Sequence, residues 1–252
     1  MRLSTPALAI YLMADDDVVE LAEAAVRGGA TAIELGIPFS DPLADGPTIQ
    51  RAGQRALRHG ITMSRALSLL SEIRRRVDVP LIPMTYAGPV LAHGERRFCE
   101  DAARAGANGV IVPDLPYDEA GELLAGCRSN GLDLIPLLAP TSREDRIAAA
   151  CAGAGGFVYI VSVAGITGSR DSLSDRVGPL IQRVRLHTDL PLLVGFGIAG
   201  GAAARAALDA DADGVVIGSK AIEVAESEGA PGLERFVREV SAALNHAPIA
   251  RR

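Results

Sequence analysis

Short apolar runs recur along the whole chain, and a stretch with a helical pattern of apolar residues follows most of them. Most of these runs carry apolar residues at consecutive positions, which is expected of strands that are covered on both faces. Such strands in alternation with helices are typical of a parallel sheet. The eight predicted strands are Ala7–Met13, Thr31–Ile37, Leu81–Tyr86, Gly109–Asp114, Asp133–Ala139, Gly156–Ser162, Pro191–Ile198 and Gly214–Ser219.

Eight parallel strands can close into a (β/α)8 barrel, and one such barrel often takes about 250 residues. The chain has 252 residues, so we expect a single TIM barrel domain over residues 1–252. The alternative is a doubly wound open sheet, which normally carries a Gly-rich loop after its first strand. Here the first strand runs into Asp15, Asp16 and Asp17, which favours the barrel. Predicted helices include Val18–Arg27, Arg65–Arg76, Gly94–Arg104, Asp118–Arg128, Arg143–Ala152 and Ala202–Asp209.

Charge and hydropathy argue against two classes of partner. The formal net charge is -6 and the basic residues are scattered, whereas a nucleic-acid surface needs clustered Lys and Arg. No apolar run approaches the roughly 18 residues of a membrane span, and the N-terminus lacks the cleavage site of a secretory signal. We therefore expect a cytoplasmic protein that binds neither nucleic acid nor membranes. Cys99, Cys127 and Cys151 are then expected to be reduced structural thiols.

In a barrel, the active site lies at the C-terminal ends of the strands and in the loops that follow them. The last two predicted strands end in Gly195-Phe196-Gly197-Ile198 and in Gly218-Ser219. Glycines at these places let backbone N–H groups approach a phosphate, and a following helix N-terminus adds a favourable dipole. The same glycines would also suit plain tight turns. Two such turns on adjacent strands favour a phosphate site.

The catalytic side chains available at the strand ends are mainly carboxylates. None of the four histidines falls at a strand end, so a histidine-ligated metal is not expected. Lys220, the only lysine, lies just beyond the eighth strand, which is a poor position for a Schiff base inside the barrel. Alternation along the second strand directs Glu34 inward, where burial should raise its pKa and suit it to acid–base work. Asp114 ends the fourth strand and is open to either capping or catalysis.

The segment ELGIPFSDPLADGPTIQ, from Glu34 to Gln50, resembles the hallmark of the tryptophan synthase alpha chain family. Further matching motifs follow in the family's order over nearly the whole chain: PMTY, VPDLP, APT, GFVY, GITG, GFGI and IGS. The resemblance implies a barrel lyase that splits indole-3-glycerol phosphate into indole and glyceraldehyde 3-phosphate by a retro-aldol reaction. It also implies that no cofactor and no metal take part.

Matching motif to motif assigns roles to individual residues. Glu34 takes the place of the acid–base glutamate. Asp45 takes that of the aspartate that accepts a hydrogen bond from the indole N–H, and Asp41 takes that of an aspartate that couples subunits. The resemblance assigns the remaining substrate contacts to Tyr159 near the glutamate, Thr167 and Gly168 in a lid, Phe196 as an indole-contacting wall, and Gly197, Gly218 and Ser219 at the phosphate.

The resemblance implies a partner as well, the tryptophan synthase beta chain in an alpha2–beta2 assembly. Two motifs near the family's docking face depart from the usual pattern: the Gly-Asp-Pro turn is replaced by Asp15-Asp16-Asp17, and the motif after Tyr86, which usually carries Asn, reads Ala87-Gly88-Pro89. A stand-alone lyase that releases free indole is therefore the alternative. A weakly active regulatory subunit and another phosphate-handling barrel enzyme are less favoured, because Glu34, Asp45 and the hallmark segment are all present.

Overall fold

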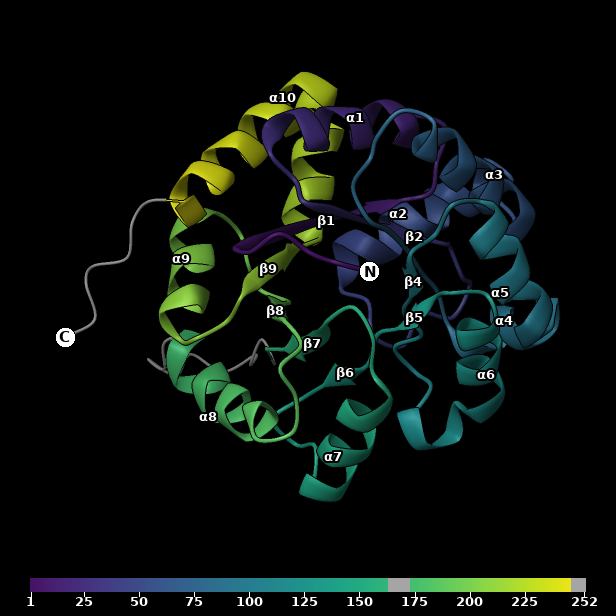
Figure 1. Cartoon of the computed structure of the whole chain (residues 1–252). Coiled ribbons are helices and arrows are strands. Elements are labelled where there is room, and N and C mark those ends of the chain that lie inside the picture. The colour runs from purple at the N-terminus through teal and green to yellow at the C-terminus, as the bar shows by residue number, and fades with distance from the viewer. Residues whose placement is uncertain (163–172, 246–252) are drawn as a thin grey trace.

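The computed structural model describes residues 1–162 and 173–245, so the predicted lid residues Thr167 and Gly168 lie outside the described residues. In the described part of the chain, parallel strands form a closed barrel inside a ring of helices (Figure 1). The strands are β1 (Ala7–Met13), β2 (Ala32–Gly36), β3 (Leu81–Met84), β4 (Gly109–Val110), β5 (Asp133–Leu134), β6 (Leu137–Leu138), β7 (Val158–Val161), β8 (Leu192–Gly195) and β9 (Gly214–Ile217).

The barrel closes through backbone hydrogen bonds on both sides of the short strand pair β4–β5. The larger sheet has the order β3-β2-β1-β9-β8-β7-β6, and β4 pairs with β5. A parallel bridge between Met84 and Ile111 joins β3 to the chain that continues β4. The fifth predicted strand is split into β5 and β6 because Pro136 has no N–H to donate to a ladder. Its neighbours complete the circle: Ile135 N–H donates to the Val110 carbonyl at 3.1 Å, and Tyr159 N–H donates to the Pro136 carbonyl at 3.0 Å. The predicted (β/α)8 barrel is confirmed.

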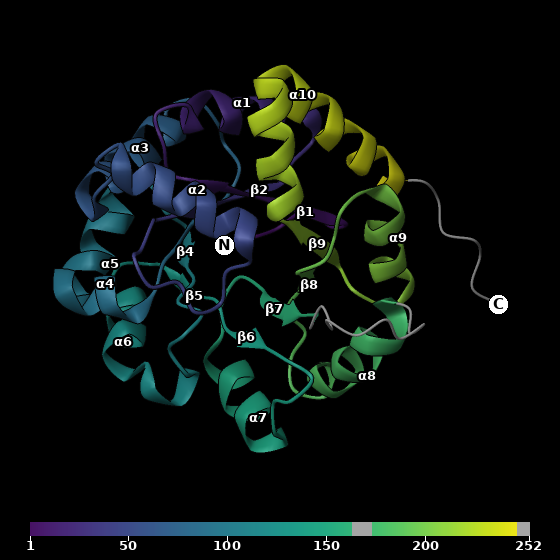
Figure 2. The same cartoon turned by 180° about the vertical axis from the view of Figure 1, so that it is seen from behind.

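Helices surround the strands on all sides, as the view from behind also shows (Figure 2). The longer helices, such as α1 and α3, bury a stripe of apolar side chains, as amphipathic helices do. α10 is broken at Gly229, which has a φ of 65° and precedes Pro231 by two residues. The helices are α1 (Val18–Gly28), α2 (Pro47–Arg58), α3 (Met63–Arg74), α4 (Ala87–His93), α5 (Glu95–Arg104), η1 (Tyr117–Glu119), α6 (Gly121–Ser129), α7 (Glu144–Gly153), α8 (Leu173–Arg185), α9 (Gly201–Asp209) and α10 (Ser219–Asn245).

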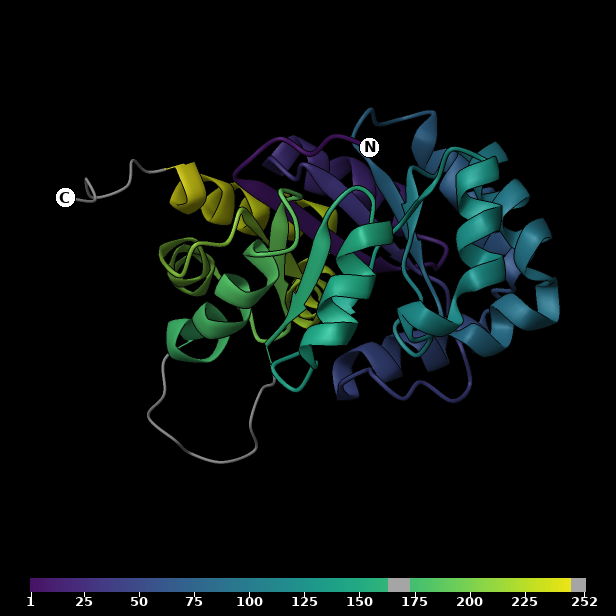
Figure 3. The ribbon, with the colours of Figure 1, turned by 60° about the horizontal axis from the view of Figure 1, so that its bottom comes forward.

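The N-terminal residues lie across one end of the barrel, and an oblique view shows helices such as α5 and α6 outside the strands (Figure 3). The α-amino group of Met1 forms an ion pair with Asp133 at the start of β5. The N-terminal residues thus lie at the end where the strands begin, whereas active sites of such barrels lie at the opposite end. Among the described residues, no helix is both long and apolar enough to cross a membrane.

Candidate active site

Glu34 is the carboxylate that the barrel buries most completely. It lies in the middle of β2, opposite Tyr11 of β1 in the parallel register, and its residue is 0% exposed. Both carboxyl oxygens are buried without a hydrogen-bond partner. An ionised carboxylate in such surroundings loses its hydration without compensation, so burial raises the pKa of Glu34 to about 8. The predicted inward position of Glu34 thus coincides with a carboxyl group that can hold a proton at neutral pH.

Two tyrosine rings lie beside Glu34, and glycines make room for them. A Cβ atom on Gly36 would come within 2.0 Å of the Tyr11 hydroxyl, and one on Gly195 within 2.1 Å of the Tyr159 hydroxyl. Any larger residue at either position would collide with a ring. Burial raises the pKa of both tyrosines well above the ordinary value, and the charge of Glu34 adds to the effect. Tyr11 is therefore part of the site. It was not predicted, because in the sequence it is one residue of an ordinary apolar strand.

A cavity of about 310 Å³ opens at the C-terminal end of the barrel, next to these rings. Among the predicted site residues, its lining includes Asp45, Tyr159, Phe196, Gly197, Gly218 and Ser219. Phe196 has a φ of 67°, which non-glycine residues rarely adopt. The residues that do adopt it are often found at functional sites. The ring of Phe196 meets that of Tyr159 edge-on, with the centroids 6.0 Å apart. The structure thus brings six of the nine predicted site residues around one cavity, while Glu34 lies beneath it.

Asp45 belongs to the loop between β2 and α2. Its pKa is raised by partial burial, and a hydrogen bond from the Tyr86 hydroxyl opposes that rise. The Tyr86 hydroxyl oxygen also accepts the backbone N–H of Ala44 at 3.0 Å. The ring centroids of Tyr86 and Phe39 are 5.6 Å apart. Tyr86 is thus held by ring packing as well as by hydrogen bonds at its hydroxyl. Tyr86 therefore holds the segment that carries Asp45, a role that the sequence pattern did not reveal.

The other carboxylates considered from the sequence lie elsewhere. The side chain of Asp114 accepts the backbone N–H of Ala87 at 2.8 Å, which supports the capping interpretation over a catalytic one. Asp41 is exposed and accepts a hydrogen bond from the hydroxyl of its neighbour Ser40. Neither is among the residues that line the cavity of about 310 Å³.

The end of the cavity at which a phosphate is predicted is lined by Gly197, Gly218 and the N-terminus of α10 at Ser219. The first-turn N–H groups of a helix lack partners within the helix, so they suit an anion. Gly197 has a φ of 75°, a conformation that glycine adopts without strain. Lys220 and Glu223 of α10 also line this end. The sequence predicted only that Lys220 is poorly placed for a Schiff base, so its place at this end of the cavity was not expected.

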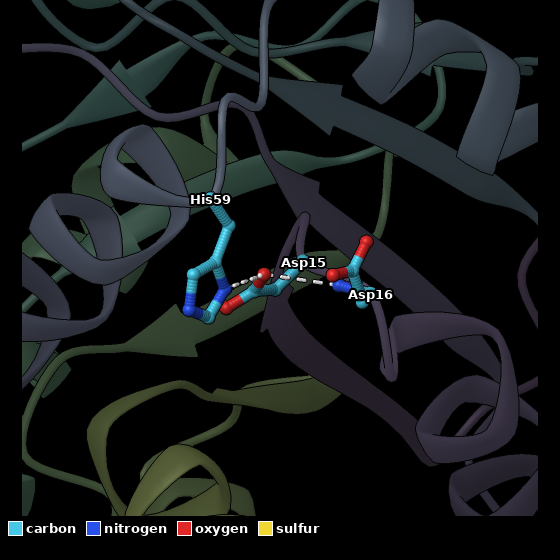
Figure 4. Close-up of side chains that lie close together, drawn as sticks. All are labelled: Asp15, Asp16 and His59. Carbon is cyan, nitrogen blue, oxygen red and sulfur yellow. Dashed lines mark hydrogen bonds and ion pairs between the residues drawn. The ribbon is translucent and has the colours of Figure 1, made fainter.

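A larger cavity of about 640 Å³ lies between α1, α2 and α10. Asp15, Asp16 and His59 meet there, with candidate ligand atoms within 4.8 Å of one another (Figure 4). His59 Nδ1 is 2.7 Å from Asp15 Oδ1. The backbone N–H of the next residue, Asp16, donates to the same oxygen at 3.0 Å. Arg55 Nε donates to Asp15 Oδ2 at 3.2 Å. Because a guanidinium already neutralises Asp15, we assign the cluster a structural role rather than a cation site.

Comparison with known proteins places this geometry in a family. The family model described as tryptophan synthase alpha chain matches residues 4–247. The tryptophan synthase alpha chain of Synechococcus elongatus is 44% identical over 247 residues, covering 96% of this chain and 93% of the relative. That of Methanosarcina mazei is 45% identical over 245 residues, with 94% and 89% covered.

Solved structures agree with the sequence relatives. A chain of tryptophan synthase from M. tuberculosis superposes with a TM-score of 0.87 at 36% identity, with 96% of this chain and 93% of that chain covered. Tryptophan synthase subunit alpha from Legionella pneumophila gives a TM-score of 0.86 at 32% identity, with 94% and 92% covered. This chain belongs to the tryptophan synthase alpha chain family.

Proposed function

We propose that this chain is a carbon–carbon lyase of tryptophan biosynthesis that cleaves indole-3-glycerol phosphate to indole and glyceraldehyde 3-phosphate in the cytoplasm. The observation that carries the proposal is the pair of carboxylates with different environments. Glu34 is buried without a hydrogen-bond partner beneath the cavity, whereas Asp45 lies on the cavity wall with Tyr86 as partner. Two carboxylates held in such different surroundings are suited to separate roles in one reaction.

Glu34 is the acid and base of the proposed reaction. A carboxyl group with a pKa of about 8 is protonated at neutral pH, so it can give its proton to C3 of the indole ring. The proton of the adjacent side-chain hydroxyl then returns to Glu34. As that hydroxyl becomes an aldehyde, the bond to C3 breaks and its electrons restore the indole ring. The carboxyl group ends the cycle protonated, as it began. Because its oxygens are covered in this structure, the Glu34 side chain or the rings above it must shift for contact with substrate.

Asp45 acts on the other side of the indole ring. Protonation at C3 places positive charge on the ring nitrogen, and a carboxylate that accepts the N–H hydrogen bond stabilises that charge. The hydrogen bond from Tyr86 favours the ionised form of Asp45, which this role requires. Tyr159 and Phe196 provide aromatic surface for the indole, and Gly197, Gly218 and Ser219 bind the phosphate at the N-terminus of α10. Thr167 and Gly168 are proposed as lid residues on the resemblance alone.

The proposed partner is a tryptophan synthase beta chain. Leu43 and Leu91 are large apolar side chains with exposures of 84% and 63%. The hydrogen bond from Ala44 N–H to the Tyr86 hydroxyl joins the loop that carries Leu43 to the start of α4, which carries Leu91. Exposed apolar side chains on linked segments support a protein contact at this end of the barrel.

A stand-alone lyase is the second candidate, and one observation favours it. Asp15, in the segment that replaces the family's usual Gly-Asp-Pro turn, forms ion pairs with Arg55 and His59 of the same chain. The Asp15 side chain is 6% exposed, so this residue is committed to internal contacts.

The test is indole release from indole-3-glycerol phosphate by the purified chain, measured with and without a purified beta chain. We expect turnover in both cases and a strong increase with the beta chain. Equal turnover in both cases would favour the stand-alone lyase. If neither condition released indole, the proposed reaction would be wrong.

A further inference from the structure

Lys220 is the only lysine among the 25 Lys and Arg residues of the chain. It is the second residue of α10 and lines the cavity of about 310 Å³ together with Gly197 and Gly218. Among the described residues of that lining, it is the one Lys or Arg. The chain thus uses arginine elsewhere and places a flexible ammonium at the phosphate end of its site.

The ion pair that Lys220 makes is one that a ligand can replace. Lys220 Nζ lies 3.5 Å from Glu223 Oε2, and the two side chains are 41% and 46% exposed. Exposed pairs of this kind contribute little to stability. Glu223 has a second partner, since the Thr48 hydroxyl of α2 donates to its Oε1 at 3.3 Å. Glu223 therefore stays anchored when Lys220 turns away.

We propose that Lys220 is a specificity residue that recognises the phosphate of the substrate by exchanging its contact with Glu223 for a contact with the phosphate dianion. The inference rests on the proposed function, because it assumes that the phosphate binds at the N-terminus of α10. Backbone N–H groups and the helix dipole offer partial charges there, whereas Lys220 adds a full positive charge within the first turn. Lys220 thereby selects phosphorylated over unphosphorylated three-carbon compounds.

The first test compares two aldehydes in the reverse reaction, the condensation of indole with glyceraldehyde 3-phosphate or with glyceraldehyde. Lys220→Met should raise the KM for glyceraldehyde 3-phosphate by about tenfold or more, the scale of one lost charge-assisted hydrogen bond, with kcat nearly unchanged. The rate with glyceraldehyde should not change, and Lys220→Arg should recover most of the selectivity. Arg235→Met is the matched control, because it removes one positive charge from the same helix at an exposed pair with Glu228. Equal losses with both aldehydes would overturn the proposal.

The second test needs no catalysis. The chain has two amines, the Lys220 side chain and the α-amino group of Met1, which pairs with Asp133 at the other end of the barrel. Limited acetylation followed by peptide mass spectrometry reports on each separately. Glycerol 3-phosphate should protect Lys220 several-fold, glycerol should not, and the labelling of Met1 should be equal in both. Unprotected Lys220 in saturating glycerol 3-phosphate would overturn the proposal. A chain that binds glycerol 3-phosphate through Lys220 but does not cleave indole-3-glycerol phosphate would refute the proposed function alone.

Discussion

Replacing Glu34 by glutamine should remove a pH dependence from the stability of the chain. Glutamine is close to glutamate in size but cannot ionise, so the packing around the side chain is largely kept. In the wild-type chain, the folded pKa of Glu34 is about 8, whereas an ordinary glutamate has 4.5. Below the lower value the carboxyl group is protonated in both states and costs nothing. As the pH rises through this window, the unfolded chain releases the proton while the folded chain keeps it, so the folded state is progressively destabilised.

The magnitude follows from the separation of the two pKa values. Between 4.5 and about 8 it corresponds to a loss of about 5 kcal/mol in unfolding free energy, of which roughly 3 kcal/mol is lost by pH 7. The stability of Glu34→Gln relative to wild type should therefore increase by about 3 kcal/mol between about pH 4.5 and about pH 7. Other titrating groups are common to both proteins and cancel in the difference.

The assay is urea unfolding of both proteins, followed by far-UV circular dichroism at several pH values in this window. Glu122→Gln, at an exposed position of α6, is the matched control and should show no such trend. A stability difference between Glu34→Gln and wild type that changes by less than about 1 kcal/mol across the window would refute the reasoning, because one displaced pKa unit alone is worth about 1.4 kcal/mol.

Two further predictions concern the walls of the site. Asp45→Asn should lower the turnover of indole-3-glycerol phosphate by about 10²-fold or more, the scale of a lost electrostatic contact, with Asp41→Asn as the control in the absence of a partner; a drop of only about twofold would remove Asp45 from the mechanism. Gly195→Ala should destabilise the chain by about 1–3 kcal/mol in thermal unfolding, because the added Cβ meets the Tyr159 ring. Gly121→Ala should not destabilise the chain, because no heavy atom lies within 4 Å of the added Cβ. Equal effects of the two changes would contradict the packing argument.

The inward position of Glu34 could be predicted because strand alternation is a local property of β2. The complete burial of its carboxyl group could not, because it depends on neighbouring side chains of other strands, such as Tyr11 of β1 and Tyr159 of β7. The break between β5 and β6 follows from Pro136, which has no N–H. Pro136 was visible in the sequence, but it stands inside a long apolar run that was predicted as one strand.

The surroundings of the loops were harder to predict than those of the strands. Asp114 could cap or catalyse until the structure placed the N–H of Ala87 on its carboxylate. Lys220 was visible as the only lysine, yet its place in the lining of the cavity depends on where α10 begins. Side-chain contacts between a loop and a distant helix, such as Asp15 with His59, leave no periodic signal in a sequence.

The most direct test of the central claim is the rate of indole release from indole-3-glycerol phosphate by wild type, Glu34→Gln and the control Glu122→Gln under identical conditions. If Glu34 donates and accepts the proton, Glu34→Gln should lose at least about 10²-fold in kcat, while the control keeps the wild-type rate. A Glu34→Gln variant that releases indole within about twofold of the wild-type rate would contradict the account, because a buried amide cannot replace the acid and base that the reaction requires.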